Sequence, residues 1–357
     1  MSLLFSPITI GTVDVRNRLW VAPLCQYSAV GGVPGAWHRT HLAQFASGGA
    51  GLILTEATAV NAEGRITPED TGIWNDAQRD AWAPIVADLR SRGAVAGIQL
   101  AHAGRKGSTW SPLISGRYGS VRPDEGGWAT VAPSAVAYPG YAVPRELDLD
   151  GIDAVVADFG AAAARAVEAG FEVLEVQAGH GYLIHQFLSP LANRRTDAYG
   201  GSLEHRARLL LRVVEAVREA AGDAAVFVRF SATDWTAGGW DVDDTVTVAR
   251  WAAEHGADFF DVSTGGTVPG ERIPVSRGYQ VPYAARVRHD TGVAVSAVGL
   301  VRTGRDAEAI LQAGDADAVM AGREWMLDPH FGLRAASELG VRLPYWPRQY
   351  AKAWDAR

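Results

Sequence analysis

Cysteine and lysine are both scarce in this chain of 357 residues. Cys25 is the single cysteine, so no internal disulfide can form, and no cluster has the spacing of a structural zinc site. Lys106 and Lys352 are the only lysines among 33 basic residues. A Schiff-base aldolase needs a lysine of depressed pKa, and neither lysine lies in a predicted barrel strand. Paired histidines such as H-x-H, which a metal-dependent hydrolase barrel would need, are also absent from the early strands.

Long apolar runs and an excess of positive charge are missing as well. No apolar run approaches the roughly 20 residues that span a bilayer. The opening MSLLFSPITIG lacks the basic start and long apolar stretch of a signal peptide. A net charge of −7 disfavours a nucleic-acid partner held by phosphate contacts. We therefore expect a cytoplasmic protein with no membrane or nucleic-acid partner and no bound metal.

Short apolar runs recur along the chain, rich in Val, Ile, Leu and Phe without strict alternation, as in buried parallel strands. They predict eight strands: Leu19–Pro23, Gly51–Thr55, Val95–Leu100, Glu172–Gln177, Ala225–Phe230, Phe259–Ser263, Ala294–Val298 and Ala318–Ala321. Helical patterns lie between them, at Gln78–Arg92, Asp150–Ala169, Leu203–Ala221, Asp243–His255, Tyr283–Asp290 and Arg305–Ala313. Eight such units favour an α/β fold of the (β/α)8 TIM-barrel type, with residues 1–357 in a single domain. No G-x-G-x-x-G follows an early strand, which weakens the alternative of an open dinucleotide-binding sheet.

Three segments stand outside this repeat. A hairpin around Ile8–Val15 is expected to close the bottom of the barrel. Residues 102–147 form a long connection after the third strand, and a connection of this length is more often a functional lid than idle chain. The tail, residues 341–357, is aromatic, with Tyr345, Trp346, Tyr350 and Trp354. Such a tail should pack onto the barrel or onto a neighbouring subunit, so we expect a homodimer or homotetramer through this C-terminal arm.

Polar residues and glycines gather where the predicted strands end. In order, these are Cys25, Thr55–Ala57, Gln99 with His102, Gln177 with His180, Arg229, Ser263, Gly299 and Gly322–Arg323. The active site of such barrels lies at the carboxyl ends of the strands, and backbone N–H groups after the seventh and eighth strands commonly bind phosphate. The residues therefore predict a phosphorylated ligand in the barrel mouth, without identifying it.

Seven stretches, spread through nearly the whole chain, carry a family resemblance. They are APLCQYS (22–28), TEATAV (55–60), QLAHAGRK (99–106), HGYLIHQFLSP (180–190), NRRTDAYGGS (193–202), AVGL (297–300) and AGRE (321–324). Together and in this order they resemble the Old Yellow Enzyme family, in its thermophilic-like and xenobiotic-reductase branch. The resemblance implies an FMN-dependent barrel that oxidises NADPH or NADH. Its second substrate would be an activated alkene, an α,β-unsaturated carbonyl or nitro compound whose C=C bond is reduced.

The resemblance also implies which residues bind the flavin. The Gln99 side chain and the Ala57 backbone would contact the pyrimidine edge, with Pro23 and Cys25 beside the ring. Arg229 would lie beside N1 and the C2 carbonyl, where a fixed cation stabilises the negative charge of reduced flavin. The phosphate would be held by Gly299, Gly322 and Arg323.

The same resemblance assigns the substrate side of the site. Hydride would pass from FMN N5 to the substrate, and Tyr182 would give the proton, since a phenol with a pKa near 10 stays protonated at neutral pH. His180 and Gln177 would hold the carbonyl or nitro oxygen through hydrogen bonds that strengthen as charge develops there. Tyr27 would line the substrate pocket, and Cys25 would contact the substrate and tune the flavin. His102 is interpreted as a loop anchor, Lys106 as a flavin-edge or lid contact, and His185 as structural.

Two positions depart from the branch. Gln177 stands where a second histidine is usual, and an amide can donate a hydrogen bond but cannot become cationic. Lys352, with Arg348 nearby, stands where an arginine often reaches the neighbouring subunit's active site, and an ammonium lacks the planar guanidinium fork. Gln177 keeps open a flavin-dependent dehydrogenase or isomerase of a specialised metabolite. A flavoprotein sensor without turnover is the other alternative, which the presence of Tyr182 and His180 disfavours.

Overall fold

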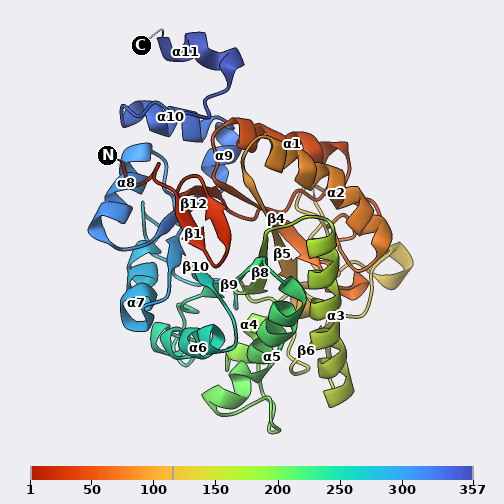
Figure 1. Ribbon diagram of the computed structural model, residues 1–357. Helices are drawn as coiled ribbons and strands as arrows, with labels where there is room; N and C mark the ends of the chain where they lie inside the picture. The colour runs from red at the N-terminus through yellow and green to blue at the C-terminus, as the bar shows by residue number, and fades with distance from the viewer. Residues whose placement is uncertain (1, 115, 356–357) are drawn as a thin grey trace.

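Eight parallel strands close into a barrel in the computed structural model, which describes residues 2–114 and 116–355. Their order around the barrel is β3 (Leu19–Val21), β4 (Leu52–Ala59), β5 (Val95–Ala101), β8 (Val173–Ala178), β9 (Ala225–Ser231), β10 (Phe259–Ser263), β11 (Val295–Ala297) and β12 (Ala318–Ala321). Helices surround this barrel (Figure 1). The predicted (β/α)8 barrel is confirmed.

Seven helices follow the strands in turn: α1 (Ala36–Ser47), α2 (Asp76–Ser91), α3 (Leu149–Glu168), α5 (Leu203–Ala221), α6 (Val242–Glu254), α7 (Val281–Thr291) and α8 (Gly304–Ala313). Shorter helices are α4 (Leu183–Leu188), α9 (Arg323–Leu327), α10 (Phe331–Glu338) and α11 (Ala351–Asp355). The six predicted helices are present to within two residues. Among the described helices, none is both long and apolar enough to cross a bilayer.

Some boundaries differ from the sequence-based prediction. The strand predicted at Gly51–Thr55 continues to Ala59, through a register shift between Leu54 and Ala57 that places polar Thr55 and Glu56 inside the strand. The first strand ends at Val21 rather than Pro23, which has no N–H for the ladder. The other strand ends differ by one residue at most.

The barrel interior is layered along the strands. Side chains of one strand face alternate sides, so every second residue points inward. The lowest inward residues form one apolar cluster, in which Trp20 packs on Phe259 with ring centroids 5.2 Å apart and Phe259 packs on Phe227 at 4.6 Å. One inward step further along β9 and β10 come Arg229 and Asp261. The interior is thus apolar at one end and charged towards the mouth.

The N-terminal hairpin closes the apolar end of the barrel. Its strands β1 (Ile8–Ile10) and β2 (Val13–Val15) pair antiparallel, as predicted. Ile10, Val13 and Val15 belong to the same apolar cluster as Trp20. Figure 1 shows this hairpin in red against the barrel end. Solvent and ligands therefore reach the interior from the opposite end.

The long connection and the tail are both anchored to the barrel. Residues 102–147 contain the 3-10 helices η2 (Gly104–Lys106) and η3 (Pro123–Glu125) and the paired strands β6 (Val131–Ala132) and β7 (Arg145–Glu146); residue 115 lies outside the described chain.

In the tail, the Tyr345 hydroxyl accepts a hydrogen bond from Asn17 Nδ2 at 2.8 Å. Beyond it, η4 (Arg348–Tyr350) and α11 extend away from the barrel (Figure 1). The side chain of Trp354 and residues 356–357 lie outside the described part.

Leu52 tests the apolar end of the barrel, because its side chain is fully buried in the lowest layer. Leu52→Ala leaves a cavity there and should lower the free energy of unfolding by about 2 to 5 kcal/mol. Leu113 in the long connection is 69% exposed, and Leu113→Ala should change it by no more than about 0.5 kcal/mol. Denaturant unfolding of both variants at one fixed FMN concentration makes the comparison, since bound ligand adds to stability. Equal losses in the two variants would contradict the layered interior.

Candidate functional site

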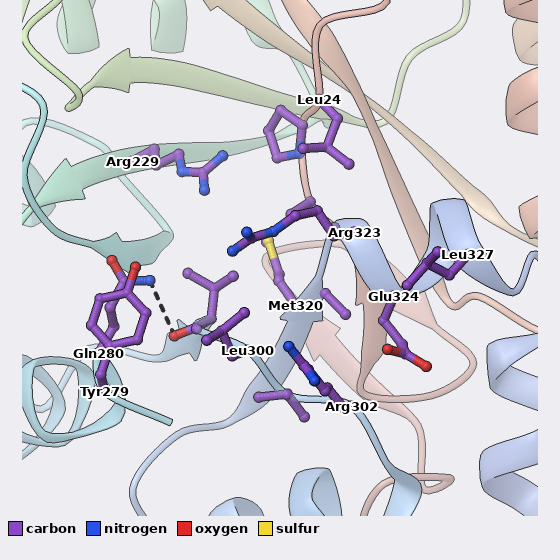
Figure 2. A pocket seen from close by; sticks show the side chains of 17 residues that line it. Leu24, Arg229, Tyr279, Gln280, Leu300, Arg302, Met320, Arg323, Glu324 and Leu327 are labelled. Atoms are coloured by element: carbon purple, nitrogen blue, oxygen red, sulfur yellow. Dashed lines mark hydrogen bonds between the residues drawn. The ribbon is translucent and has the colours of Figure 1, made fainter. Parts of the chain in front are cut away.

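A cavity of about 330 Å³ opens at the carboxyl ends of β3, β11 and β12. Figure 2 shows its lining. The sequence-predicted cofactor residues that line it are Pro23, Arg229, Gly299, Gly322 and Arg323. Residues that the sequence did not single out also line it, among them Leu24, Tyr279, Gln280, Leu300, Arg302 and Met320. Its volume falls in the range of roughly 300–1,000 Å³ typical of small-molecule sites.

Glycines let the backbone approach this cavity closely. Gly299 has φ +130°, a conformation that side chains disfavour, and a Cβ there would lie 3.3 Å from Gln280. A Cβ on Gly322 would lie 3.1 Å from a Leu24 methyl group. The Gln280 side chain is itself held, because its Oε1 accepts a hydrogen bond from Thr264 Oγ1 at 2.9 Å. The two strand ends therefore offer narrow turns whose backbone N–H groups can face a ligand.

Arginines give the cavity its charge. Arg229, Arg302 and Arg323 all line it, and Figure 2 shows the guanidinium groups of Arg229 and Arg323 directed into the same space. Guanidinium groups match the geometry of phosphate oxygens and remain charged at every physiological pH. The donor set therefore fits FMN, an anionic ligand with a phosphate at one end and a polar ring edge at the other.

Gln99 lies deeper in the barrel than the cavity lining. Its Nε2 donates a hydrogen bond to Glu175 Oε1 at 2.8 Å. Gln99 and Ala57 are partners in the register between β5 and β4, so the structure brings these two predicted residues together. Neither of them lines the 330 Å³ cavity.

The Gln177 amide has a fixed orientation. Its Oε1 accepts a hydrogen bond from the Gly179 N–H at 2.9 Å, so its Nε2 is directed towards His180 Nδ1, 3.3 Å away. On the other side of the ring, His180 Nε2 lies 2.9 Å from Ser263 Oγ. That hydroxyl donates to the Phe230 carbonyl, so it accepts from Nε2–H and leaves Nδ1 as an acceptor. Gln177 and His180 therefore form one hydrogen-bonded pair, so the structure brings these two predicted site residues together.

Burial keeps the side chains of His180, Tyr182 and Cys25 in their uncharged forms. Burial, followed by the charges of Arg229 and Lys106, lowers the pKa of His180 well below its usual range. Burial likewise raises the pKa of the Tyr182 phenol and of the Cys25 thiol well above their usual ranges. At neutral pH the imidazole is uncharged, and the phenol and thiol hold their protons.

Cys25, Tyr27 and Tyr182 share one electrostatic neighbourhood. The Cys25 thiol is hydrogen-bonded to the Tyr27 side chain and to the Ala57 backbone, and Cys25 and Tyr27 both act on the pKa of Tyr182. Tyr27 has φ +51°, a strained conformation for a residue with a side chain, which fixes the direction in which its ring leaves the backbone. None of these three residues lines the 330 Å³ cavity, so the predicted substrate residues gather in a second group.

Lys106 connects the long connection to this second group. Its Nζ donates hydrogen bonds to the carbonyl oxygens of His180 at 2.8 Å and Gly266 at 3.0 Å. It also lies 5.0 Å from the ring centroids of Tyr182 and Tyr138. Burial lowers its pKa to about 8. Lys106 therefore contacts both Tyr138 in the long connection and the turn at Tyr182, while Lys352 is exposed on the C-terminal arm.

Two other histidines, His102 and His185, form hydrogen bonds with backbone groups near the site. His102 Nδ1 accepts a hydrogen bond from the Gly104 N–H at 3.1 Å, so it anchors its own loop. His185 Nδ1 accepts from the Gly181 N–H at 2.9 Å, and its Nε2 lies 3.1 Å from Asp234 Oδ1 in a fully buried pair. Within residues 2–114 and 116–355, no group of three or more metal-binding side chains is placed to hold an ion.

Comparison with known proteins gives one consistent result. The model of the "NADH:flavin oxidoreductase / NADH oxidase family" matches residues 3–341. An NADPH dehydrogenase of Listeria welshimeri is 44% identical over 357 residues, covering 99% of this chain and all of the relative. Morphinone reductase superposes with a TM-score of 0.79 at 32% identity, covering 96% of this chain and 91% of its own. An old yellow enzyme homologue from Zymomonas mobilis superposes with a TM-score of 0.78 at 30% identity, covering 98% of both chains.

The family match extends over the segments that form the cavity and the Gln177–His180 pair. The chain therefore belongs to the NADH:flavin oxidoreductase / NADH oxidase family, the Old Yellow Enzyme family of FMN-dependent oxidoreductases that use NADPH or NADH.

Proposed function

We propose that this protein reduces the C=C bond of α,β-unsaturated carbonyl or nitro compounds with electrons from NADPH or NADH. The observation that carries the proposal is that Lys106 contacts both the ring of Tyr182, a phenol that burial keeps protonated, and the backbone of His180, whose imidazole pairs with the Gln177 amide. These groups lie at the same end of the barrel as the arginine-lined cavity. Bound FMN would supply the two-electron chemistry that links the nicotinamide to the alkene.

The cavity residues would hold FMN. Gly299, Gly322 and Arg323 would bind its phosphate through backbone N–H groups and a guanidinium. Arg229 would face the pyrimidine side of the ring, with Gln99 and the Ala57 backbone at its edge and Pro23 and Cys25 against it. Arg302 joins this set as a second cation near the phosphate end.

The substrate oxygen would be held chiefly by Gln177. The Nε2–H of His180 already goes to Ser263 in this arrangement, whereas Gln177 Nε2 carries two hydrogens and has only long contacts, at 3.3 and 3.5 Å. An uncharged amide donor still favours the transition state, because negative charge builds on the oxygen as the alkene is reduced. Tyr182 would then protonate the α-carbon, and Tyr27 would line the pocket.

An anaerobic absorbance titration tests the proposed function. NADPH should bleach the flavin absorbance of the purified protein, and 2-cyclohexenone added next should restore it. Restoration by oxygen alone would contradict the enone reaction and leave the family assignment intact. A flavin that NADPH does not bleach, but that a saturated substrate does, would support the alternative of a dehydrogenase or isomerase, which Gln177 keeps open.

Tyr182→Phe tests the proton donor. The variant keeps the ring but loses the only proton that the phenol can give, so reoxidation of the flavin by enone should slow by at least about 100-fold. Reduction by NADPH should change little, because it needs no proton from this residue. Stopped-flow absorbance measures the two half-reactions separately. Tyr199→Phe is the control, since that hydroxyl is bonded to Arg212, outside the groups described above; an enone step equally slow in both variants would refute the assignment.

We also propose that the C-terminal arm joins two or more copies of the chain. Leu333, Trp346 and Tyr350 border an open hollow of about 480 Å³ beside the arm. On the neighbouring α9, Leu327 is 82% exposed and Met326 is 50% exposed. Apolar surface of this kind is typically covered in an assembly. Lys352 or Arg348 would then approach the site of the neighbouring copy.

Sedimentation velocity tests the arm. The full chain should sediment as a dimer or tetramer, and a chain that ends at Pro347 should sediment as a smaller species that retains its flavin absorbance. Tyr345, which packs on the chain's own barrel, is kept in this truncation. An unchanged mass would show that the contact between copies lies elsewhere.

A further inference from the structure

Arg229 shares the barrel interior with two buried carboxyl groups that the proposed reaction does not use. Asp261 and Glu175 are both 0% exposed. Along their strands they lie one inward step below Ser263 and Gln177, between the apolar lower layer and the residues of the mouth. Carboxyl groups in the middle of a barrel core are costly to bury, so their partners decide what they do.

Asp261 is the direct partner of Arg229. The two residues are neighbours in the register between β10 and β9, and Arg229 Nε lies 2.9 Å from Asp261 Oδ2. The contact is an ion pair without the alignment of a hydrogen bond. Ser296 Oγ on the next strand donates to Asp261 Oδ1 at 3.0 Å. Asp261 therefore has a cation on one side and a hydroxyl donor on the other, which suits a charged carboxylate.

The surroundings of Glu175 stabilise a negative charge much less than those of Asp261 do. Its Oε1 accepts a hydrogen bond from the neutral Gln99 amide at 2.8 Å, and its Oε2 has no hydrogen-bond partner within the described chain. Burial raises the pKa of Glu175 to about 8; the charge of Asp261 acts in the same direction, and Arg229 opposes both. One guanidinium balances one carboxylate, so the second acid is more stable as a neutral carboxyl group.

We propose that Asp261 sets the reduction potential of bound FMN by neutralising Arg229, while Glu175 beside it stays protonated. This inference rests on the proposed position of the flavin over Arg229. Reduction of FMN takes up two electrons and one proton and leaves one negative charge on the pyrimidine side of the ring. Arg229 attracts that charge and Asp261 repels it, so the pair stabilises the reduced flavin less than a lone arginine would. Asp261 is thus a positioning residue that acts through Arg229. It makes the reduced flavin a stronger electron donor than it would be beside an arginine without a carboxylate partner.

The matched variants Asp261→Asn and Glu175→Gln test this inference. Each replaces a carboxyl group by an amide of the same shape in the same layer. At pH 7, Asp261→Asn made in the Glu175→Gln background removes a charge that Glu175 cannot replace by ionising, so the ratio of reduced to oxidised FMN affinity should rise at least tenfold, a positive shift of about 30 mV in the two-electron potential. Glu175→Gln replaces one neutral group by another, so the ratio should change by less than a factor of two. The potentials are measured against reference dyes, without alkene substrate.

Infrared spectroscopy of the FMN-bound protein at pH 7 tests the location of the proton. The carbonyl band of a protonated carboxyl group should be present in the unaltered chain and weaken in Glu175→Gln. Asp70 can add to the same band, because burial raises its pKa to about 7, so the assignment uses the difference between this variant and the unaltered chain. An unchanged band in Glu175→Gln would place the proton on another residue and overturn the inference.

The outcomes separate this inference from the proposed function. A positive shift in Asp261→Asn supports the inference even if enones prove not to be substrates, because no alkene enters the measurement. An unchanged or more negative potential when Asp261→Asn is added to Glu175→Gln, in a protein that binds FMN, overturns it, whatever the turnover. If Asp261→Asn does not fold in this background, Asp261→Ser removes the same charge with a smaller side chain, and the same positive shift is required.

Discussion

The ion pair between Arg229 and Asp261 lies at the level of the barrel where apolar packing gives way to polar contacts. One inward step below them, Phe227 and Phe259 stack in the lowest layer, which the N-terminal hairpin covers. Because that end is closed, the guanidinium can face only the mouth. The position of a fixed cation at the mouth therefore follows from how the opposite end of the barrel is packed, and Arg229 adds its charge to the cavity next to β12.

Desolvation determines the protonation of the other groups in the mouth. Burial is the first cause of the pKa shifts of Cys25, His180 and Tyr182, and in each case it favours the uncharged form. Arginines are the exception, because their guanidinium groups stay charged when buried. The mouth therefore combines charged arginines in the cavity lining with uncharged Cys25, His180 and Tyr182, next to which Lys106 carries a charge at neutral pH. This arrangement suits the proposed function, in which an anionic cofactor and an uncharged alkene bind in the same mouth.

The sequence predicted the barrel well because its strands are apolar runs bounded by glycine and polar residues. The prediction missed two segments in which polar residues are buried. Helix α1 carries buried His38 and His41, which interrupt its apolar period. In β4, the polar residues Thr55 and Glu56 interrupt the apolar run, so the second half of the strand was not predicted. Strand ends identified the cavity glycines and Arg229, and the family resemblance identified Tyr182. Glu175 and Asp261 were missed for a different reason. Each is one charged residue inside an apolar run, VLEVQA and FFDVS, and alternation alone does not tell which strand face points into a barrel.

The scarcity of lysine has a practical consequence for handling the protein. Lys106 is enclosed by two carbonyl oxygens and two tyrosine rings, whereas Lys352 is exposed on the C-terminal arm. Amine-directed chemistry would therefore modify the side chain of Lys352 in preference to that of Lys106. A fluorophore coupled at Lys352 would report on the surroundings of the arm, including the proposed contact with a neighbouring copy.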